Sequence, residues 1–270
     1  MKILRYILAL SSFTAIAQVG IGTSTPNGIL EINSPNSGLV YPVVALTATN
    51  LQGPVSNPNS GSIVAGTVVY NTNLNNSGTE SVYPGTYMWD GNKWIPQFSK
   101  RQSEIYFQNA TVLRTESDLS DQDVLGIGVS DNKFFRTKYD GFYRIEIRAN
   151  FGAGRVNSPV TGADNAAFQD GTFKFTFNGS TYHLNVKSIS TYDDSSGSTI
   201  FYEGVWKESY LVVYVDLVAA TDYYFNLTFS QSPSPAFVDG GNSGDGRGYV
   251  GKDVPCSIEF TYVEDYTADN

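Results

Sequence analysis

Apolar and polar residues alternate along several segments of the second half of the chain. From 143 to 151 every odd-numbered side chain is apolar and every even-numbered one is polar, and the pattern recurs at 173–177, 182–187 and 223–229. A period of two puts successive side chains on opposite faces of a strand, so these segments are predicted to be half-buried strands. No segment longer than three turns carries a helical stripe.

Turn signals separate the expected strands. Tyr139-Asp140-Gly141, Asn178-Gly179 and Ser196-Gly197 fit hairpins, because Gly and Asn tolerate the backbone angles of tight turns. Residues 210–215 are apolar at both parities, which indicates a strand covered on both sides, by the second sheet and a loop or by a neighbouring subunit. Residues 103–270 are therefore predicted to form an all-β, antiparallel jelly-roll sandwich.

Residues 18–102 have a different pattern, with many Gly, Pro, Asn, Ser and Thr residues between short apolar pieces. They predict an extended, stalk-like region that contains a hairpin, because Asp90-Gly91 is a tight-turn signal and lies between Trp89 and Trp94. So few apolar clusters do not readily bury a core of their own. We expect this region to pack against copies of itself or against the sandwich, which favours an oligomer.

The first 17 residues are predicted to be a cleavable signal peptide. A short basic start with Lys2 and Arg5 precedes an apolar run, and Ala15-Ile16-Ala17 has the small-x-small pattern of a cleavage site, which would leave Gln18 first. The alternative is a first helix of the fold. The apolar run is shorter than the roughly 20 residues that cross a bilayer, so no membrane span is expected in the mature chain. The expected location is secreted or at the cell surface.

Composition narrows the classes of function. The chain has 17 Lys and Arg against 26 Asp and Glu, a formal net charge of −9, and 14% aromatic residues. Aromatic side chains bury enough apolar area to favour a folded chain, and an acidic chain without a basic cluster lacks the footprint of a nucleic-acid binder. The single cysteine, Cys256, has the parity of a buried strand residue and cannot form an intrachain disulfide.

Candidate catalytic chemistry is sparse. The one histidine, His183, alternates with polar residues on the expected wet face of a strand, and one His with one Cys cannot supply a metal site of that type. Carboxylates between Asp193 and Glu208 offer a weak hydrolase alternative. Asp239, Asn242 and Asp245 place oxygen ligands along a flexible loop, which makes calcium a hypothesis. The prediction is a protein that is not an enzyme and has no resident cofactor.

Exposed aromatic residues are the remaining functional signal. Trp206, Tyr202 and Tyr210 are candidates for binding a surface glycan or a protein ligand. The alternative is that these three side chains form the seam between subunits, where aromatic residues are also enriched.

Several motifs carry a resemblance to known families. In the first hundred residues these are Val19-Gly20-Ile21-Gly22-Thr23 with Pro26, Leu30-Glu31-Ile32, Gly38-Leu39-Val40-Tyr41-Pro42, Leu46-Thr47, Gly66-Thr67-Val68-Val69-Tyr70-Asn71-Thr72 and Tyr87-Met88-Trp89-Asp90-Gly91-Asn92-Lys93-Trp94. They resemble a segment of secreted surface proteins of Bacteroidota and of tail-fibre-like and adhesin-like proteins. Further on, Gly141-Phe142-Tyr143-Arg144-Ile145, the Tyr- and Phe-rich strands at 210–229 and Ile258-Glu259-Phe260-Thr261-Tyr262 are similar to the C1q/TNF-like jelly roll.

The second resemblance implies a homotrimer that uses an aromatic-rich inner face as its seam. Together the resemblances imply a secreted, non-enzymatic structural or adhesive surface protein that presents a β-sandwich head for attachment. The alternative is a monomeric, lectin-like carbohydrate-binding module.

Overall fold

The computed structural model describes residues 18–109, 112–116, 120–158, 165–194 and 199–264. The predicted signal peptide and the Ser196-Gly197 turn lie outside these residues. The chain divides into a small unit up to Val43 and a large unit from Val44 onward. In the small unit, β1 (Val19–Ile21) and β2 (Leu30–Ile32) form a parallel pair.

A small sheet opens the large unit. Its strands are β3 (Val43–Val44), β4 (Val68–Asn71), β5 (Gly85–Trp89) and β6 (Trp94–Pro96), and a short 3-10 turn, η1 (Gly78–Glu80), lies between β4 and β5. The expected hairpin is confirmed as β5 and β6, in which Trp89 pairs with Trp94. This region also has a small hydrophobic core, which the sequence pattern did not predict. It is formed by Leu46, Ile63, Val69, Val82, Tyr87, Trp89 and Trp94.

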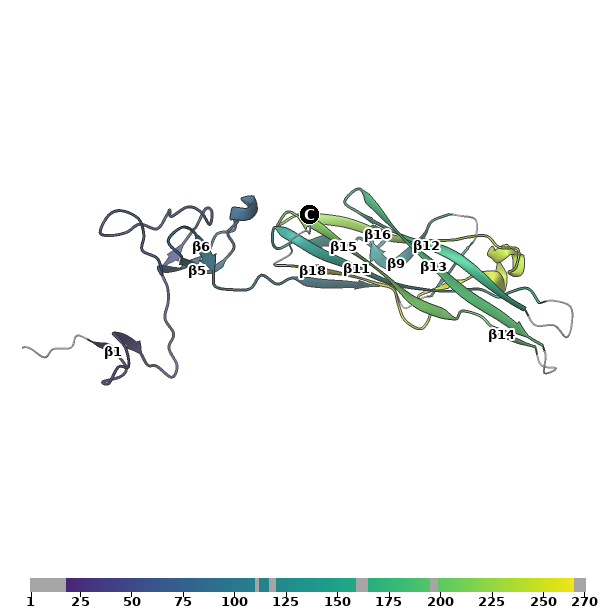
Figure 1. Ribbon diagram of the computed structural model, residues 1–270, viewed down its shortest axis with the longest axis horizontal. Helices are drawn as coiled ribbons and strands as arrows, with labels where there is room; N and C mark the ends of the chain where they lie inside the picture. Colours follow the sequence, from purple (N-terminus) through teal and green to yellow (C-terminus); the bar gives the residue numbers. More distant parts are fainter. Residues whose placement is uncertain (1–17, 110–111, 117–119, 159–164, 195–198, 265–270) are drawn as a thin grey trace, which may run out of the picture. The chain divides into compact units, whose positions relative to one another are not determined.

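The rest of the large unit is a sandwich of two antiparallel sheets (Figure 1). The first sheet contains β7 (Ser103–Phe107), β18 (Ser257–Tyr262), β11 (Gly141–Gly152) and β15 (Trp206–Leu217), with the short β17 (Tyr249–Val250) and β8 (Leu113–Arg114). The second contains β10 (Phe134–Arg136), β16 (Asp222–Gln231), β12 (Asn165–Phe177), β13 (Ser180–Asp193), β14 (Ile200–Tyr202) and β9 (Gln122–Gly128).

The chain crosses between these sheets repeatedly, from β10 to β11, back to β12, and again from β13 to β15 and from β15 to β16. This crossing is the jelly-roll arrangement, so the predicted fold class is confirmed. In the described residues the only helical pieces are 3-10 turns, which besides η1 are η2 (Val129–Asp131), η3 (Val238–Gly241) and η4 (Gly244–Gly246).

The core of the sandwich lies between the inner faces of the two sheets. The odd-numbered side chains from Tyr143 to Phe151 are buried there, as the alternation predicts, opposite Phe173, Phe175 and Phe177. Cys256 is also fully buried. Burial raises the pKa of its thiol to about 12, which makes it the unreactive packing residue that its parity indicates.

The Asn178-Gly179 hairpin between β12 and β13 is confirmed. Asn178 has φ of 47° and Gly179 has φ of 80°, the left-handed region that a two-residue hairpin turn requires. The turn sets the register in which Phe177 pairs with Ser180, and that register puts Phe173, Phe175 and Phe177 on the core face.

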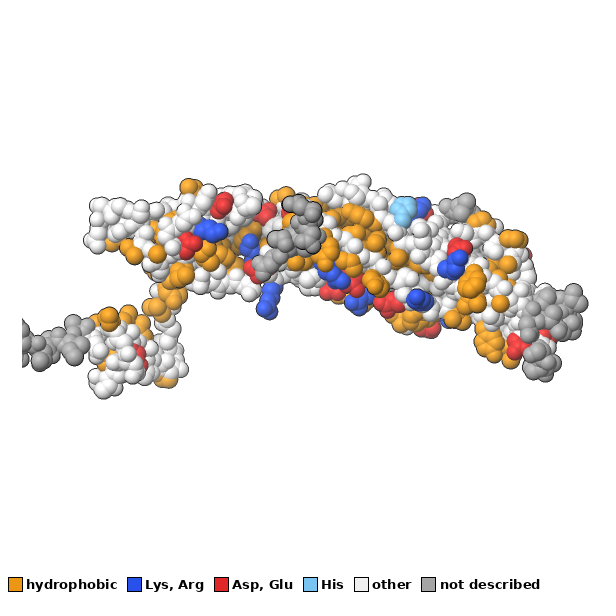
Figure 2. Space-filling model, viewed as in Figure 1, with side chains coloured by type: hydrophobic (Ala, Val, Ile, Leu, Met, Phe, Trp, Pro, Cys, Tyr) orange, Lys and Arg blue, Asp and Glu red, His pale blue; other side chains and the backbone are white. Residues whose placement is uncertain are grey.

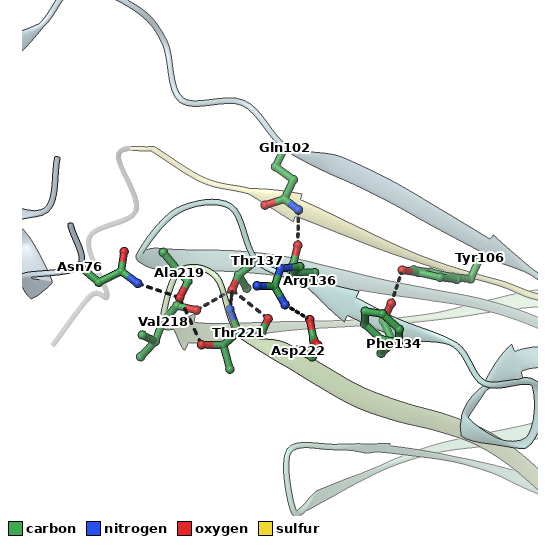
Figure 3. Close-up of polar contacts among 10 residues, drawn as sticks. All are labelled: Asn76, Gln102, Tyr106, Phe134, Arg136, Thr137, Val218, Ala219, Thr221 and Asp222. Carbon is green, nitrogen blue, oxygen red and sulfur yellow. Dashed lines mark hydrogen bonds and ion pairs between the residues drawn. The ribbon is translucent and has the colours of Figure 1, made fainter. Parts of the chain in front are cut away.

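Asp140 joins the small sheet to the sandwich. Its carboxylate accepts hydrogen bonds from Ser81 Oγ, from Tyr83 Oη at 3.0 Å and from the backbone N–H of Ala219 at 2.8 Å. Tyr83, Tyr139 and Ala219 form a buried cluster beside it. A second bond, from Asn76 Nδ2 to the carbonyl oxygen of Ala219 at 3.1 Å, links the same two parts (Figure 3).

Candidate assembly surface

One lateral side of the sandwich is closed by hydrogen bonds between the sheets (Figure 3). Tyr106 Oη on β7 donates to the carbonyl oxygen of Phe134 on β10 at 2.7 Å, and Gln102 Nε2 donates to the carbonyl oxygen of Arg136 at 2.7 Å. These bonds tie the edge strand of the first sheet to the edge strand of the second. The apolar interior is therefore sealed on this side.

The opposite side, between β13 and β15, has a different character. Most of β13 is an edge, because β14 pairs only with its last three residues, and β15 is the other edge. Along these edges the core-facing side chains of Tyr182, Leu184, Leu211, Val213 and Val215 are only half-buried. Figure 2 shows hydrophobic side chains gathered over the middle of the sandwich, where Figure 1 places β15. We call this side the open side.

The outer face of the first sheet adjoins the open side and carries further exposed apolar groups. Tyr210 and Tyr214 project from β15, and Tyr210 has 68% of its surface exposed. Across the sheet Ile105 and Phe107 project from β7 and are also exposed. The face is therefore apolar along both margins.

An ion-pair row runs between these margins. Glu146 on β11 pairs with Arg144 and with Arg148, whose Nε lies 2.6 Å from the Glu146 carboxylate. The hydrogen bond from Arg148, with help from Arg144, holds the pKa of Glu146 below its usual range although burial opposes this. The charge of Glu146 is thus already paired within one chain.

A groove of about 260 Å³ lies on the same face. Ile105 and Phe107 line it on one side, Glu208 and Arg148 on another, and Pro255 at its end. An apolar groove with a few polar groups can receive a side chain of another molecule.

The three aromatic residues singled out in the sequence are not assembled into one site. Trp206 and Tyr210 lie on the same outward face of β15, opposite Gly152 and Arg148 of β11, whereas Tyr202 lies on β14 of the second sheet. Trp206 is half-buried and its indole N–H donates to Asp253 Oδ2 at 3.1 Å. Trp206 and Tyr210 therefore both lie on the outer face of the first sheet, where Tyr210 is the more exposed of the two. A ligand-binding role for the three residues stays a prediction.

The predicted calcium residues lie in the loop that contains η3 and η4. Asp245 Oδ2 accepts a hydrogen bond from Arg155 at 2.5 Å, and Asp239 Oδ2 accepts one from Ser243 Oγ at 2.9 Å. Asn242 follows η3 as its C-terminal flanking residue. Within the described residues no group of three or more His, Cys, Asp or Glu side chains is placed to hold a metal. Calcium at this loop stays a prediction.

The residues weighed for catalysis are placed on separate parts of the fold. His183 is exposed on β13, as expected from its parity. Glu203 is bound to Arg155 at 2.9 Å and to Tyr249 Oη at 3.0 Å, while Glu208 lies on the outer face of β15.

In the described part of the chain, no helix is long and apolar enough to cross a membrane.

Sequence reasoning missed Ile105 and Phe107. Both lie on β7, whose five residues are exposed or half-buried, so this strand lacks the clean dry face of the others. Its position at the edge of the sheet, beside β18, brings these two side chains onto the same face as Tyr210. No local pattern in the sequence predicts that Ile105 and Phe107 share a face with Tyr210.

A match to a known protein family points to assembly as well. Residues 20–111 match the family described as "Phage tail like trimerisation region". The matched range runs from β1 to the end of β7 and so includes Ile105 and Phe107. The match supports a homo-oligomeric structural protein of a tail-fibre-like kind, and it names assembly rather than catalysis.

No curated protein matches the chain. Among solved structures, "Structure of Eiger TNF from S. frugiperda" is similar over 63% of this chain and 97% of that chain, with a TM-score of 0.29 and 9% sequence identity.

Proposed function

We propose that the protein is a secreted, non-enzymatic structural protein of the cell surface that assembles as a homotrimer and presents its sandwich as a head for attachment. The single observation that carries the proposal is the trimerisation match over residues 20–111. The exposed apolar groups of the open side and the adjoining outer face, among them Tyr210, Ile105 and Phe107, are consistent with such an assembly.

Burial of the open side in a trimer has a simple physical basis. Half-buried Leu211, Val213 and Val215 already contact the core, so a second copy needs only to cover their remaining surface. Large exposed apolar patches on a soluble protein mark interaction sites, because covering them releases ordered water. On the outer face Glu146 is already paired with Arg144 and Arg148 of its own chain, so covering it would not leave an unpaired carboxylate.

The trimer is tested by light scattering of the purified chain on a size-exclusion column. The variant Tyr210→Glu puts a carboxylate on the proposed seam, and Tyr224→Glu is the matched control, because Tyr224 is similarly exposed on the other sheet. We expect the seam variant to shift the mass from trimer toward monomer while the control stays trimeric. A seam variant that assembles like the wild type would contradict the role of this surface.

The location and the display of the head need a separate test. An antibody raised against the sandwich should label intact cells that produce the protein, without permeabilisation. Labelling only after lysis would refute the surface location and leave the trimer untouched. A fluorescently labelled trimer that binds cells or matrix, and a monomeric seam variant that binds more weakly, would support attachment through several heads.

A further inference from the structure

The small unit carries an apolar face on one side of its strand pair. In the β1 and β2 pair, Val19 lies beside Leu30 and Ile21 beside Ile32. Directly paired residues project from the same side of a sheet, and residues two apart on a strand do as well. All four aliphatic side chains therefore project from one side of the pair, and each has between 43% and 59% of its surface exposed.

The opposite side of the pair is polar and locally satisfied. Gly20 and Glu31 project there, and the Glu31 carboxylate accepts hydrogen bonds from the backbone N–H of Asn27 at 2.5 Å and from Asn27 Nδ2 at 3.0 Å. The two sides thus differ sharply in chemistry. The Glu31 side is suited to solvent, and the aliphatic side is suited to contact with an apolar surface.

The connection between the two strands is shaped for this pairing. Only residues 22–29 join β1 to β2, fewer than the dozen that a parallel connection usually needs. Gly22 makes this possible, because it has φ of +73° and a Cβ there would lie 2.1 Å from the carbonyl oxygen of Asn33. The pair is closed by hydrogen bonds from Val19 N to Ile29 O and from Asn33 N to Ile21 O, both 2.8 Å.

A two-stranded sheet of three residues per strand does not hold itself together in water. Its stability depends on covering the four aliphatic side chains, and residues 20–32 fall inside the range that matches a trimerisation region. Because the apolar side carries no charge, identical copies can meet there without repulsion. A second copy of this chain is therefore the partner that fits this face.

We propose that three copies of residues 19–32 bring this face together around a common axis and bury Val19, Ile21, Leu30 and Ile32 as a separate core. This inference rests on the proposed trimer. It adds a seam that is distinct from the one on the sandwich.

The test introduces one cysteine into the full chain, as Ile21→Cys, and oxidises the protein mildly before denaturing electrophoresis. Cys256 does not interfere, because it is fully buried. Disulfides form when Cα atoms are about 4.4–6.8 Å apart, so only chains that meet at this face are linked. We expect covalent dimers that approach two of every three chains, since three thiols around an axis form one bond and leave one free.

Leu30→Cys repeats the test at a neighbouring position, in case Ile21→Cys does not fold. Leu125→Cys is the matched control, because Leu125 on β9 is 51% exposed and lies outside the proposed seam. Covalent dimers from residues 21 and 30 but not 125 support the inference. Trimers by light scattering that give no dimers, or equal dimers from the control, overturn it. A monomeric wild type instead refutes the proposed function itself.

Discussion

Asp140 offers the sharpest test of how the two parts of the large unit are held together. Asp140→Ala removes the acceptor of three hydrogen bonds, and the donors on Ser81, Tyr83 and Ala219 are all buried. A hydrogen bond to a charged group contributes about 1.5–3 kcal/mol, and a buried donor left without a partner costs a comparable amount. Because these bonds share one carboxylate their losses do not add, so we expect about 3–5 kcal/mol of destabilisation.

Tyr83→Phe is the partner substitution. It removes a hydroxyl that donates to the Asp140 carboxylate at 3.0 Å and accepts from the Asp140 backbone N–H at 2.8 Å, which predicts a loss of about 1–2 kcal/mol. Each single variant removes the hydrogen bond between the Tyr83 hydroxyl and the Asp140 carboxylate, but the double variant loses that bond only once. The coupling energy between the two sites should therefore be about 1 kcal/mol or more.

The assay is urea unfolding followed by tryptophan fluorescence, since Trp89 and Trp94 are buried in the small sheet. Tyr70→Phe serves as the control. Tyr70 is exposed, so removing its hydroxyl should change the free energy of unfolding by no more than about 0.5 kcal/mol. Strictly additive effects of Asp140→Ala and Tyr83→Phe would refute the account of this joint, as would a stability of Asp140→Ala equal to that of the control.

Three further predictions concern the sandwich and the ends of the chain. Because the pKa of Glu146 is lowered in the folded protein, its ion pairs stabilise the fold above the ordinary carboxyl pKa of 4.5, and this stability is lost as the pH falls through the lowered pKa. Glu146→Gln should therefore reduce the fall in the free energy of unfolding on the acid side of its pH profile. An unchanged profile would contradict the pairing. The secreted protein should begin at Gln18 by intact-mass measurement, and a retained leader would show that the cleavage prediction is wrong. Calorimetric titration with calcium tests the calcium hypothesis: heat that Asp239→Ala reduces would support it, whereas no heat at millimolar calcium would remove it.

The alternation of side chains was enough to predict the sandwich because burial imposes a period of two on every strand that covers the core. Tyr143 and its odd-numbered neighbours are buried for this reason, and the Asn178-Gly179 turn follows from local backbone preferences. The small sheet was harder to foresee. Its core combines Leu46, Val69 and Trp94 from strands and loops far apart in sequence, so no single window contains enough apolar residues to reveal it.

The candidate assembly surface was predictable only in part. Tyr210 stood out because it is aromatic within a strand that is apolar at both parities. Tyr202 is also an aromatic residue close to Trp206 in the sequence, but it lies on the other sheet. The sheet to which a strand belongs depends on pairing between distant segments, which the local sequence does not show. Ile105 joins Tyr210 for the same reason, through β18 and β11, which no local pattern encodes.

Assembly into three copies is the central claim, and the mass of the intact complex tests it most directly. Native mass spectrometry of the purified wild-type protein across a tenfold range of concentration should give one species at three times the mass of one chain. The full chain has a mass of 29.4 kDa. A single species at the mass of one chain throughout that range would contradict the account.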